Sequence, residues 1–249
     1  MSVRFSKAIV VGASSGVGEA IARELAGEGT SVALVARREQ ELSRLESALR
    51  ETNPHVRSYP HDVTRFDDTS ALFDRVTRDL GGLDLLVYAA GVMPELEESE
   101  YSFDKDRQMV EVNLLGAMAW CNLAAARFEA AQAGTILGIS SIAGERGRRG
   151  NPGYCASKAA LTTYLEALRN RLSRYGVNVV TIKPGFVDTR MTKGKKGLFW
   201  LVSAREAAAT SLALAKTPGS PSAFVPWRWT LVALVVRLIP SFLFKKLNF

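Results

Sequence analysis

Short, mostly apolar runs rich in β-branched residues alternate along this chain with stretches of helical periodicity. The first run, residues 8–11, leads through a cluster of glycines into a pattern that places Ile21 and Leu25 on one helical face. The later runs are residues 32–35, 56–59, 83–87, 134–139, 177–182 and 223–225. Such alternation is typical of parallel strands joined by crossover helices. We therefore predict an α/β fold with one doubly wound, seven-stranded parallel sheet, and long helices near residues 105–131 and 153–175.

The glycine cluster between the first predicted strand and the first helix reads GASSGVG over residues 12–18. Backbone N–H groups and the helix dipole at such a turn can hold a pyrophosphate. A glycine-rich stretch alone can be only a tight turn, but its place after a buried strand and before a helix favours phosphate binding. The sequence thus predicts a Rossmann-type dinucleotide site formed by Gly12, Ser14, Ser15, Gly16, Val17 and Gly18.

The second predicted strand ends in Ala36-Arg37-Arg38. In such sites an acidic residue about 20 positions after the glycines binds the ribose 2′-OH of NAD, whereas a nearby arginine accommodates the 2′-phosphate of NADP. The strand end carries no acid, and guanidinium groups suit a phosphate because they present several donors in one plane. We predict NADP(H) rather than NAD(H) as the cofactor. Arginines that are merely solvated at a strand end are the alternative.

Tyr154 and Lys158 lie four residues apart in the predicted helix 153–175, so their side chains share one helix face. A free tyrosine with a pKa of about 10 is a poor base at neutral pH, but a nearby cation favours the phenolate and lowers that pKa. The pair could therefore transfer a proton. The same spacing occurs by chance on many solvated helices, so other parts of the chain have to support this interpretation.

The composition limits the remaining classes of protein. The 249 residues, 47% of them hydrophobic, contain no repeat, low-complexity tract or linker, which favours one domain with a sizeable core. Within it we expect a dinucleotide-binding catalytic part, residues 1–226, and an apolar, basic helical tail, residues 227–249, packed as part of the same domain. Residues 1–7 carry no secretory signal, so we expect a cytoplasmic protein. Cys121 and Cys155 are too few for a disulfide framework, and no Cys/His spacing indicates a metal site.

With these features and several further motifs, the sequence resembles the short-chain dehydrogenase/reductase family over essentially its whole length. The further motifs are Asp62-Val63, Ala89-Ala90-Gly91, Asn113, Ser140-Ser141 and Pro184-Gly185 with Thr189. Two positions depart from the family pattern: Ala89 replaces an asparagine that commonly supports the sheet near the cofactor, and Val11 replaces a threonine before the first glycine. We expect only a modest local change, because the backbone turn at Ala90-Gly91 is retained.

The resemblance implies a catalytic tetrad and a set of cofactor contacts. The tetrad consists of Asn113, Ser141, Tyr154 and Lys158, with Ser140 as the less favoured alternative to Ser141. Beyond the glycine-rich turn, the implied cofactor contacts are Arg37, Arg38, Asp62, Val63, Ala90, Gly91, Asn113, Tyr154, Lys158, Pro184, Gly185, Val187 and Thr189. A homodimer or homotetramer is also expected.

Each member of the tetrad has an expected role. Tyr154 exchanges a proton with the substrate oxygen, and Ser141 polarises that oxygen. Lys158 lowers the tyrosine pKa and holds the nicotinamide ribose. Asn113 holds a water that links Lys158 to the solvent.

The leading hypothesis is therefore an NADP(H)-dependent oxidoreductase that interconverts a carbonyl, of a lipophilic ketone or aldehyde, and a secondary alcohol by hydride transfer. A 3-oxoacyl thioester reductase is an alternative, favoured by the formal net charge of +7 because acyl carriers are acidic. A non-catalytic NADP-binding sensor or scaffold is the alternative from another class; such relatives often lose the tyrosine or the lysine, and this chain keeps both. Nucleic acid is not expected as a partner, because the basic groups lack interleaved aromatic residues.

Residues 188–202 are expected to determine the choice of substrate. This segment mixes Met191 and the apolar residues 198–201 with Lys193, Lys195 and Lys196. The mixture indicates an apolar pocket under a mobile basic lid, although a plain surface loop would also account for the lysines.

The tail has an unusual composition for this family. Only eight residues separate Arg228 from Arg237, and Pro240 follows, so a membrane-spanning helix is disfavoured. Tryptophans at one end and lysines at the other suit a helix that lies in a membrane surface. A subunit interface accounts for the apolar residues equally well.

Overall fold

The computed structural model describes residues 3–97, 99–195 and 197–247. Seven parallel strands form one sheet in the spatial order β3-β2-β1-β4-β5-β6-β9. The strands are β1 (Lys7–Val11), β2 (Ser31–Ala36), β3 (Val56–Pro60), β4 (Leu85–Tyr88), β5 (Gly134–Ile139), β6 (Val177–Pro184) and β9 (Ser222–Val225). Each predicted strand corresponds to one of these, so the seven-stranded parallel sheet is confirmed.

Strand β1 lies inside the sheet and pairs in parallel with both β2 and β4, so that Ala8 lies opposite Val32 on one side and Leu85 on the other. The chain builds β2 and β3 on one side of β1 and then returns to build β4 on its other side. The carboxyl ends of β1 and β4 therefore border a crevice of the kind in which open α/β sheets bind ligands. Ile9 and Val11 are fully buried, as expected for a strand covered on both faces.

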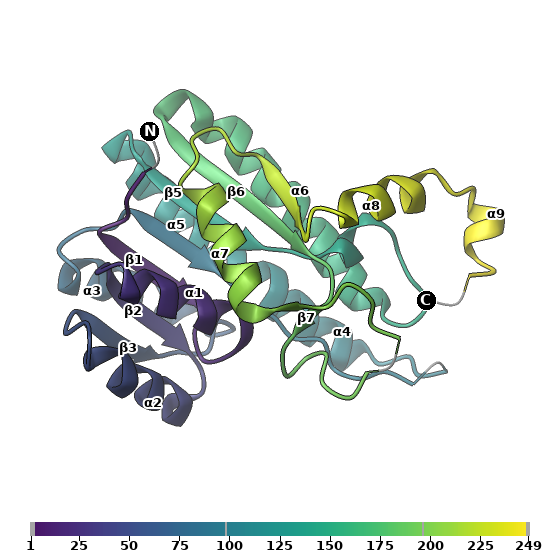
Figure 1. Ribbon diagram of the computed structural model, residues 1–249, viewed down its shortest axis with the longest axis horizontal. Helices are drawn as coiled ribbons and strands as arrows, with labels where there is room; N and C mark the ends of the chain where they lie inside the picture. Colours follow the sequence, from purple (N-terminus) through teal and green to yellow (C-terminus); the bar gives the residue numbers. More distant parts are fainter. Residues whose placement is uncertain (1–2, 98, 196, 248–249) are drawn as a thin grey trace.

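Helices cover both faces of the sheet (Figure 1). One face carries α1 (Gly16–Gly27), α2 (Glu39–Arg50) and α7 (Ala204–Ala215), and the other carries α3 (Phe66–Asp79), α5 (Gly116–Ala131) and α6 (Pro152–Leu172). Leu25 and Leu212 belong to the first apolar cluster, and Trp120 and Leu165 belong to the second. The two clusters together form the core on either side of the sheet.

The predicted helix near residues 105–131 is one long helical stretch with a π-helical turn inside it. It consists of α4 (Phe103–Val110), the π-helical turn Glu111–Leu115 and α5. In the described part of the chain, Phe103–Ala131 is the one helix long and apolar enough to cross a membrane, with a mean hydropathy of 1.3 and half of its apolar window buried. Trp120 and Phe128 are fully buried against the sheet, so here the apolar composition belongs to the core.

The chain beyond β6 contains one small sheet that the sequence did not predict, and the tail, for which the sequence predicted helix. A two-stranded parallel sheet of β7 (Val187–Asp188) and β8 (Val202–Ser203) closes off the segment between them, and α7 follows. The tail forms α8 (Trp229–Leu238) and the short α9 (Ser241–Phe244), which lie beyond the sheet at the right of Figure 1. Lys196 of the predicted basic lid and residues 248–249 of the predicted tail lie outside the described residues.

Candidate active site

A cavity of about 440 Å³ opens at the carboxyl ends of the strands, where the strand order changes direction. It is lined by the predicted residues Gly12, Ser14, Ser15, Gly16, Val17, Arg37, Arg38, Asp62, Val63, Ala90, Gly91, Ser141, Tyr154, Lys158, Pro184, Gly185, Val187 and Thr189. Two predicted residues, Gly18 and Asn113, do not line this cavity. The structure therefore brings the predicted cofactor and catalytic residues together around one space.

The glycine-rich turn has backbone angles that allow it to pack closely against neighbouring backbone and to lie close to a ligand. Gly12 and Gly16 adopt positive φ angles of 92° and 62°, which favour glycine. A side chain at Gly12 would overlap the backbone of residues 89–90, and one at Gly18 would overlap the carbonyl of Gly12. Gly18 thus serves the packing of α1 against the turn. Because α1 begins at Gly16, the N–H groups of its first turn lie at the cavity without partners inside the helix.

Arg37 and Arg38 lie in different environments at the end of β2. Arg38 Nη2 donates to the hydroxyls of Ser14 at 2.9 Å and Ser15 at 2.6 Å, so its guanidinium is fixed against the glycine-rich turn. Arg37 is largely exposed, and its Nη1 lies 3.3 Å from Asp62 Oδ2. A guanidinium has five N–H donors, so both arginines retain donors for a phosphate.

Asp62 follows β3 and lies on the wall of the same cavity. Its Oδ1 accepts hydrogen bonds from the backbone N–H of Thr64 at 3.1 Å and the hydroxyl of Thr64 at 2.9 Å. Burial raises the pKa of Asp62, but these bonds and the Arg37 charge outweigh burial and lower its net pKa. Asp62 is therefore a carboxylate at neutral pH and can accept a hydrogen bond from a ligand amino group.

The two neighbouring serines after β5 have different partners. Ser141 precedes the 3-10 turn Ile142–Glu145, and its Oγ accepts a hydrogen bond from Ala143 N at 3.1 Å. Ser141 and Tyr154 both line the cavity, and the hydrogen bond between their side chains acts to lower the pKa of the phenol. Ser140 Oγ instead bonds the carbonyl of Lys158 at 3.0 Å and lies 2.7 Å from the hydroxyl of Thr162. The geometry thus favours Ser141 over Ser140 as the serine that meets a ligand.

Tyr154 and Lys158 are both buried, and Lys158 Nζ lies 5.9 Å from the centroid of the Tyr154 ring. The ammonium donates to the carbonyl of Ile139 at 2.9 Å. Burial raises the pKa of Tyr154, while its hydrogen bond with Ser141 and the charge of Arg148 act in the opposite direction without reversing the rise. Burial also lowers the pKa of Lys158 to about 8. The expected lowering of the tyrosine pKa by Lys158 is therefore not found, because lost hydration outweighs the nearby charges.

Asn113 lies inside the π-helical turn and is fully buried behind the cavity wall. Its Oδ1 accepts from Val92 N at 2.7 Å, and its Nδ2 donates to Val92 O at 3.0 Å and to Ser157 Oγ at 3.0 Å. A side chain at Gly91 would lie 3.4 Å from both Asn113 Oδ1 and Lys158 Nζ. Asn113 therefore connects the chain after β4 to α6 by hydrogen bonds, next to Lys158.

Tyr88 supports this arrangement and was missed by the sequence analysis. It ends β4, is fully buried, and donates its hydroxyl to the carbonyl of Val112 at 2.6 Å. Burial raises the pKa of Tyr88 well above its ordinary value, so the hydroxyl keeps its proton. The signal available in the sequence was a phenol at the end of an otherwise aliphatic strand, directly before the position where the family asparagine is absent.

The segment after β7 closes over the glycine-rich turn. A side chain at Gly16 would lie 3.2 Å from the methyl group of Thr189, and Thr189 N donates to Thr192 Oγ1 at 3.1 Å. The cavity is also lined by Ser140, the alternative serine, by Met191 of the predicted substrate segment, and by Ala36, His61, Ala89, Val92, Val112, Ile139, Arg190 and Thr192. Most of these flank a predicted residue, so they follow from the backbone path.

An aromatic cluster joins this segment to the tail. It consists of Phe186, Phe199, Trp200 and Trp229, with ring centroids between 5.0 and 5.9 Å apart. The Trp229 indole packs directly on Gly185, where any side chain would overlap it. Gly185 is therefore required by the tail as well as by the cavity.

These residues fit a nicotinamide dinucleotide. The turn at Gly12 and Gly16 leaves room for a pyrophosphate beside a helix N-terminus. Asp62 offers an ionised acceptor, and Arg38 lies at the end of β2 where a 2′-phosphate would be recognised. The fold and the cavity thus define a doubly wound α/β protein with a candidate dinucleotide site.

Comparison with known proteins identifies the family. The family model for short chain dehydrogenase matches residues 6–197. An uncharacterized oxidoreductase of Myxococcus xanthus is 30% identical over 240 residues, which cover 96% of this chain and 95% of that protein. An uncharacterized oxidoreductase of Staphylococcus aureus is 34% identical over 185 residues, which cover 74% of this chain and 79% of that protein. The chain belongs to the short-chain dehydrogenase family.

Solved structures agree with this assignment. An actinorhodin polyketide ketoreductase variant with NADPH is 27% identical, with a TM-score of 0.79 over 90% of this chain and 97% of that one. A short-chain type dehydrogenase/reductase from Mycobacterium ulcerans has a TM-score of 0.81 at 23% identity, covering 90% of each chain. The second likeness bears on the fold alone.

Proposed function

We propose that this protein is an NADP(H)-dependent reductase of carbonyl compounds, or in reverse a dehydrogenase of secondary alcohols, in which Tyr154 is the acid and base. The observation that carries the proposal is the convergence of Ser141, Tyr154 and Lys158 on the same cavity as the glycine-rich turn and Arg38. A sensor or scaffold would have no need for a buried phenol beside a buried lysine. The ketoreductase with NADPH, at 27% identity, supports both the reaction class and the cofactor.

In this reaction the bound cofactor supplies or accepts hydride at the carbonyl carbon. Ser141 Oγ, whose lone pair is engaged by Ala143 N, donates its O–H to the substrate oxygen. Tyr154, kept protonated by burial, donates its proton to that oxygen in the reductive direction. Lys158 holds the ribose side of the cofactor, and its ammonium stabilises the tyrosinate that remains.

Asn113 keeps the catalytic side chains in their relative positions. By bonding Val92 and Ser157 it fixes the loop after β4 and the first half of α6 relative to each other. Asn113 Oδ1 and Lys158 Nζ both lie near Gly91, so a water held by Asn113 would lie close to the lysine. We assign the return of a proton to Tyr154 to such a water, as the resemblance implies.

The surroundings of Tyr154 favour a lipophilic substrate. An apolar cluster contains Tyr154 and Ala143, and Val92, Met93 and Met191 pack against it. A carbonyl compound with an aliphatic or ring body would bury these side chains while its oxygen meets Tyr154 and Ser141. A 3-oxoacyl thioester is the second candidate, because Lys193 and Lys195, which follow Met191 in the chain, could meet an acidic carrier.

The function is tested by following NADPH oxidation with a panel of aliphatic, aromatic and steroidal ketones and aldehydes, together with 3-oxoacyl thioesters. We expect turnover with lipophilic free carbonyls. The kcat/KM with NADH should be at least tenfold lower than with NADPH, which is about the difference that one charge-assisted hydrogen bond provides. Equal efficiency with NADH would contradict the cofactor assignment. Turnover confined to thioesters would favour the second candidate.

Arg38 is the residue on which NADP selectivity should depend. Arg38→Ala removes the guanidinium that donates to Ser14 and Ser15. The KM for NADPH should therefore rise roughly tenfold to a hundredfold, which corresponds to the free energy of the charged hydrogen bonds that are lost. The KM for NADH should change much less. Arg50→Ala, which removes an exposed partner of Glu46 on the same α2 helix, is the matched control and should leave both values unchanged.

A further inference from the structure

The tail presents an apolar surface that is exposed to solvent. We define the tail face as Trp227, Leu231, Leu234, Val235, Leu238 and Phe242, of which Leu238 is 72% and Trp227 70% exposed. In α8 only Trp229 and Ala233 are buried, although eight of its ten residues are apolar. A helix that is apolar on all sides is expected to be covered on all sides. The tail face therefore lacks a cover in the described chain.

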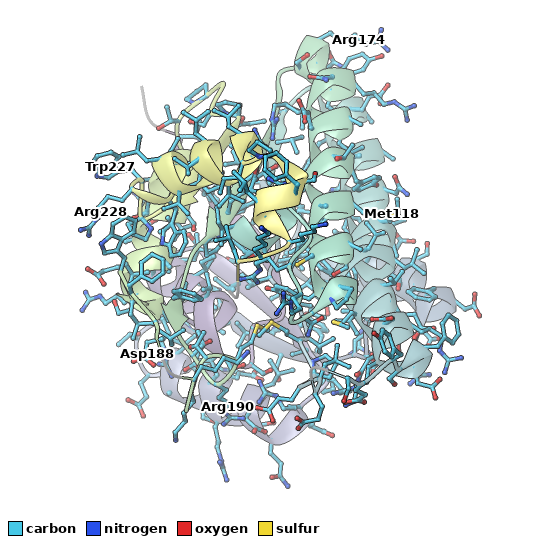
Figure 2. All side chains as sticks on the ribbon, turned by 90° about the vertical axis from the view of Figure 1, so that its right-hand side faces the viewer. Met118, Arg174, Asp188, Arg190, Trp227 and Arg228 are labelled. Carbon is cyan, nitrogen blue, oxygen red and sulfur yellow. The ribbon has the colours of Figure 1, made fainter. Side chains whose placement is uncertain are left out.

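The tail is held in place by arginine side chains that donate hydrogen bonds to its backbone carbonyls. Arg146 donates to the carbonyls of Val236 at 2.7 Å and Ile239, which caps the end of α8. Arg149 donates to the carbonyl of Lys245 at 3.0 Å. Figures 1 and 2 place α8 and α9 together on one flank of the molecule, outside the helices that cover the sheet. The tail face is thus a fixed feature of the fold.

The charge around the tail face has one sign. From residue 207 to the end the sequence contains no acid, and its cations include Arg228, Lys245 and Lys246 at the two ends of the tail. Glu145, the acid next to the tail, is already engaged by Lys183 at 2.9 Å and by Arg237. A second copy docked face to face would bring this basic rim onto an identical basic rim, which costs free energy. Anionic lipid headgroups are the complement that fits.

The tail face is continuous with the segment that closes the cavity. Phe199 stacks on Trp229 with ring centroids 5.0 Å apart, and the Arg228 guanidinium lies 5.5 Å from the centroid of Trp200. Phe199, Trp200 and Leu201 are themselves about half exposed. Trp227 and Arg228 lie at the outer edge of the molecule in Figure 2, the positions that suit a membrane interface.

We propose that the tail face is a docking surface for an anionic lipid bilayer, in which α8 and α9 lie in the headgroup region with Arg228, Lys245 and Lys246 on the phosphates. The apolar side chains of the tail face enter the acyl boundary, as the apolar faces of interfacial helices do. Residues 199–201 then meet the same surface, so a lipophilic carbonyl compound could pass from the bilayer to the cavity. The docking itself does not depend on the proposed reaction.

The test is flotation of the full chain with vesicles of phosphatidylcholine that contain phosphatidylglycerol, and with vesicles of phosphatidylcholine alone. We expect binding to the anionic vesicles that weakens with salt, because exposed charges are screened. The double variant Leu234→Glu/Leu238→Glu should lower partitioning about tenfold or more, since both side chains lose their apolar insertion. Neutralising Lys245 and Lys246 to Gln should lower it about fivefold for each residue.

Two controls keep the outcomes distinct. Tyr101→Glu places one glutamate, against two in the Leu234/Leu238 variant, on an exposed aromatic position outside the tail face and should bind vesicles as the unmodified chain does. Tyr154→Phe should also bind normally, so a failure of the proposed reaction would leave this result intact. Absence of flotation by the unmodified chain, or unchanged flotation of the Leu234/Leu238 variant, would overturn the proposal. The proposal would also be overturned if the Leu234/Leu238 variant changed only the oligomeric state, as measured by sedimentation velocity. That result would assign the tail face to contact with a second copy of the chain.

Discussion

Burial acts on Tyr154 and Lys158 in a way that spacing alone does not indicate. Both groups lose hydration in the cavity wall, which raises the pKa of the phenol and lowers the pKa of the ammonium to about 8. Both shifts favour neutral forms. In the reductive direction of the proposed reaction, a tyrosine that is kept protonated gives up its proton only when negative charge develops on the substrate oxygen.

The lowered pKa of Lys158 predicts a pH dependence of stability. Its folded pKa of about 8 lies below the unfolded value of about 10.4, so the unfolded chain binds the extra proton between these pH values. The cost of burying the ammonium is therefore fully present below pH 8 and is relieved as the pH rises towards 10. Against Lys158→Met, the unmodified chain should gain up to about 3 kcal/mol over that window.

Urea unfolding of both chains at several pH values between 7 and 10 measures this difference. Because other groups titrate in both chains, the difference isolates Lys158. A difference that stays constant with pH would show that the lysine is not perturbed in the folded state.

The π-helical turn is the element that could not be foreseen from periodicity. The run from residue 103 to 131 reads as one helix, and a single inserted turn changes neither its composition nor its apolar face enough to be seen. The partners that stabilise it come from distant segments: Tyr88 from β4 bonds Val112, and Ser157 from α6 bonds Asn113.

Tyr88→Phe tests whether this turn positions the site. Loss of the bond to Val112 O should lower the free energy of unfolding by about 1 kcal/mol. It should also lower kcat about tenfold, because a shift of the π-helical turn would displace the catalytic side chains. The KM for NADPH should change little. Tyr59→Phe, which removes a bond from another strand-end phenol to Asp79, is the matched control. If both variants lose stability and neither loses kcat, Tyr88 has only a structural role.

The elements that the sequence predicted share one property. The seven strands are determined by local apolar runs, and the glycine-rich turn by the backbone angles that glycine allows. Both signals are visible within a few residues of sequence, as at residues 8–18. The β7–β8 pair and the contacts of Arg146 with the tail join segments far apart in the chain, the latter about 90 residues away. No local pattern carries that information.

The whole molecule behaves as one unit if the tail packs as part of the catalytic domain. Trp229 is buried on Gly185, and Glu145 links Lys183 of β6 with Arg237 of α8. Loss of these contacts would therefore affect the sheet and the cavity together. We propose that residues 1–226 and the tail unfold in a single transition.

Trp229→Ala should lower the free energy of unfolding by about 3–5 kcal/mol, because it leaves a large cavity over Gly185. Trp227→Ala, two residues away but exposed, should change it by no more than about 0.5 kcal/mol. Calorimetry measures both values. Two separate transitions in the unmodified chain would contradict a single domain.

The proposed role of Tyr154 as the proton donor of an NADP(H)-dependent carbonyl reductase is measured most directly by the variant Tyr154→Phe. The variant keeps the ring and loses only the hydroxyl, so kcat should fall roughly a hundredfold to ten-thousandfold while the Kd for NADPH stays nearly unchanged. Tyr164→Phe, which removes a phenol on the same α6 helix that bonds Asn122, should keep full activity. Near-normal kcat in Tyr154→Phe with a carbonyl substrate and NADPH would contradict the account.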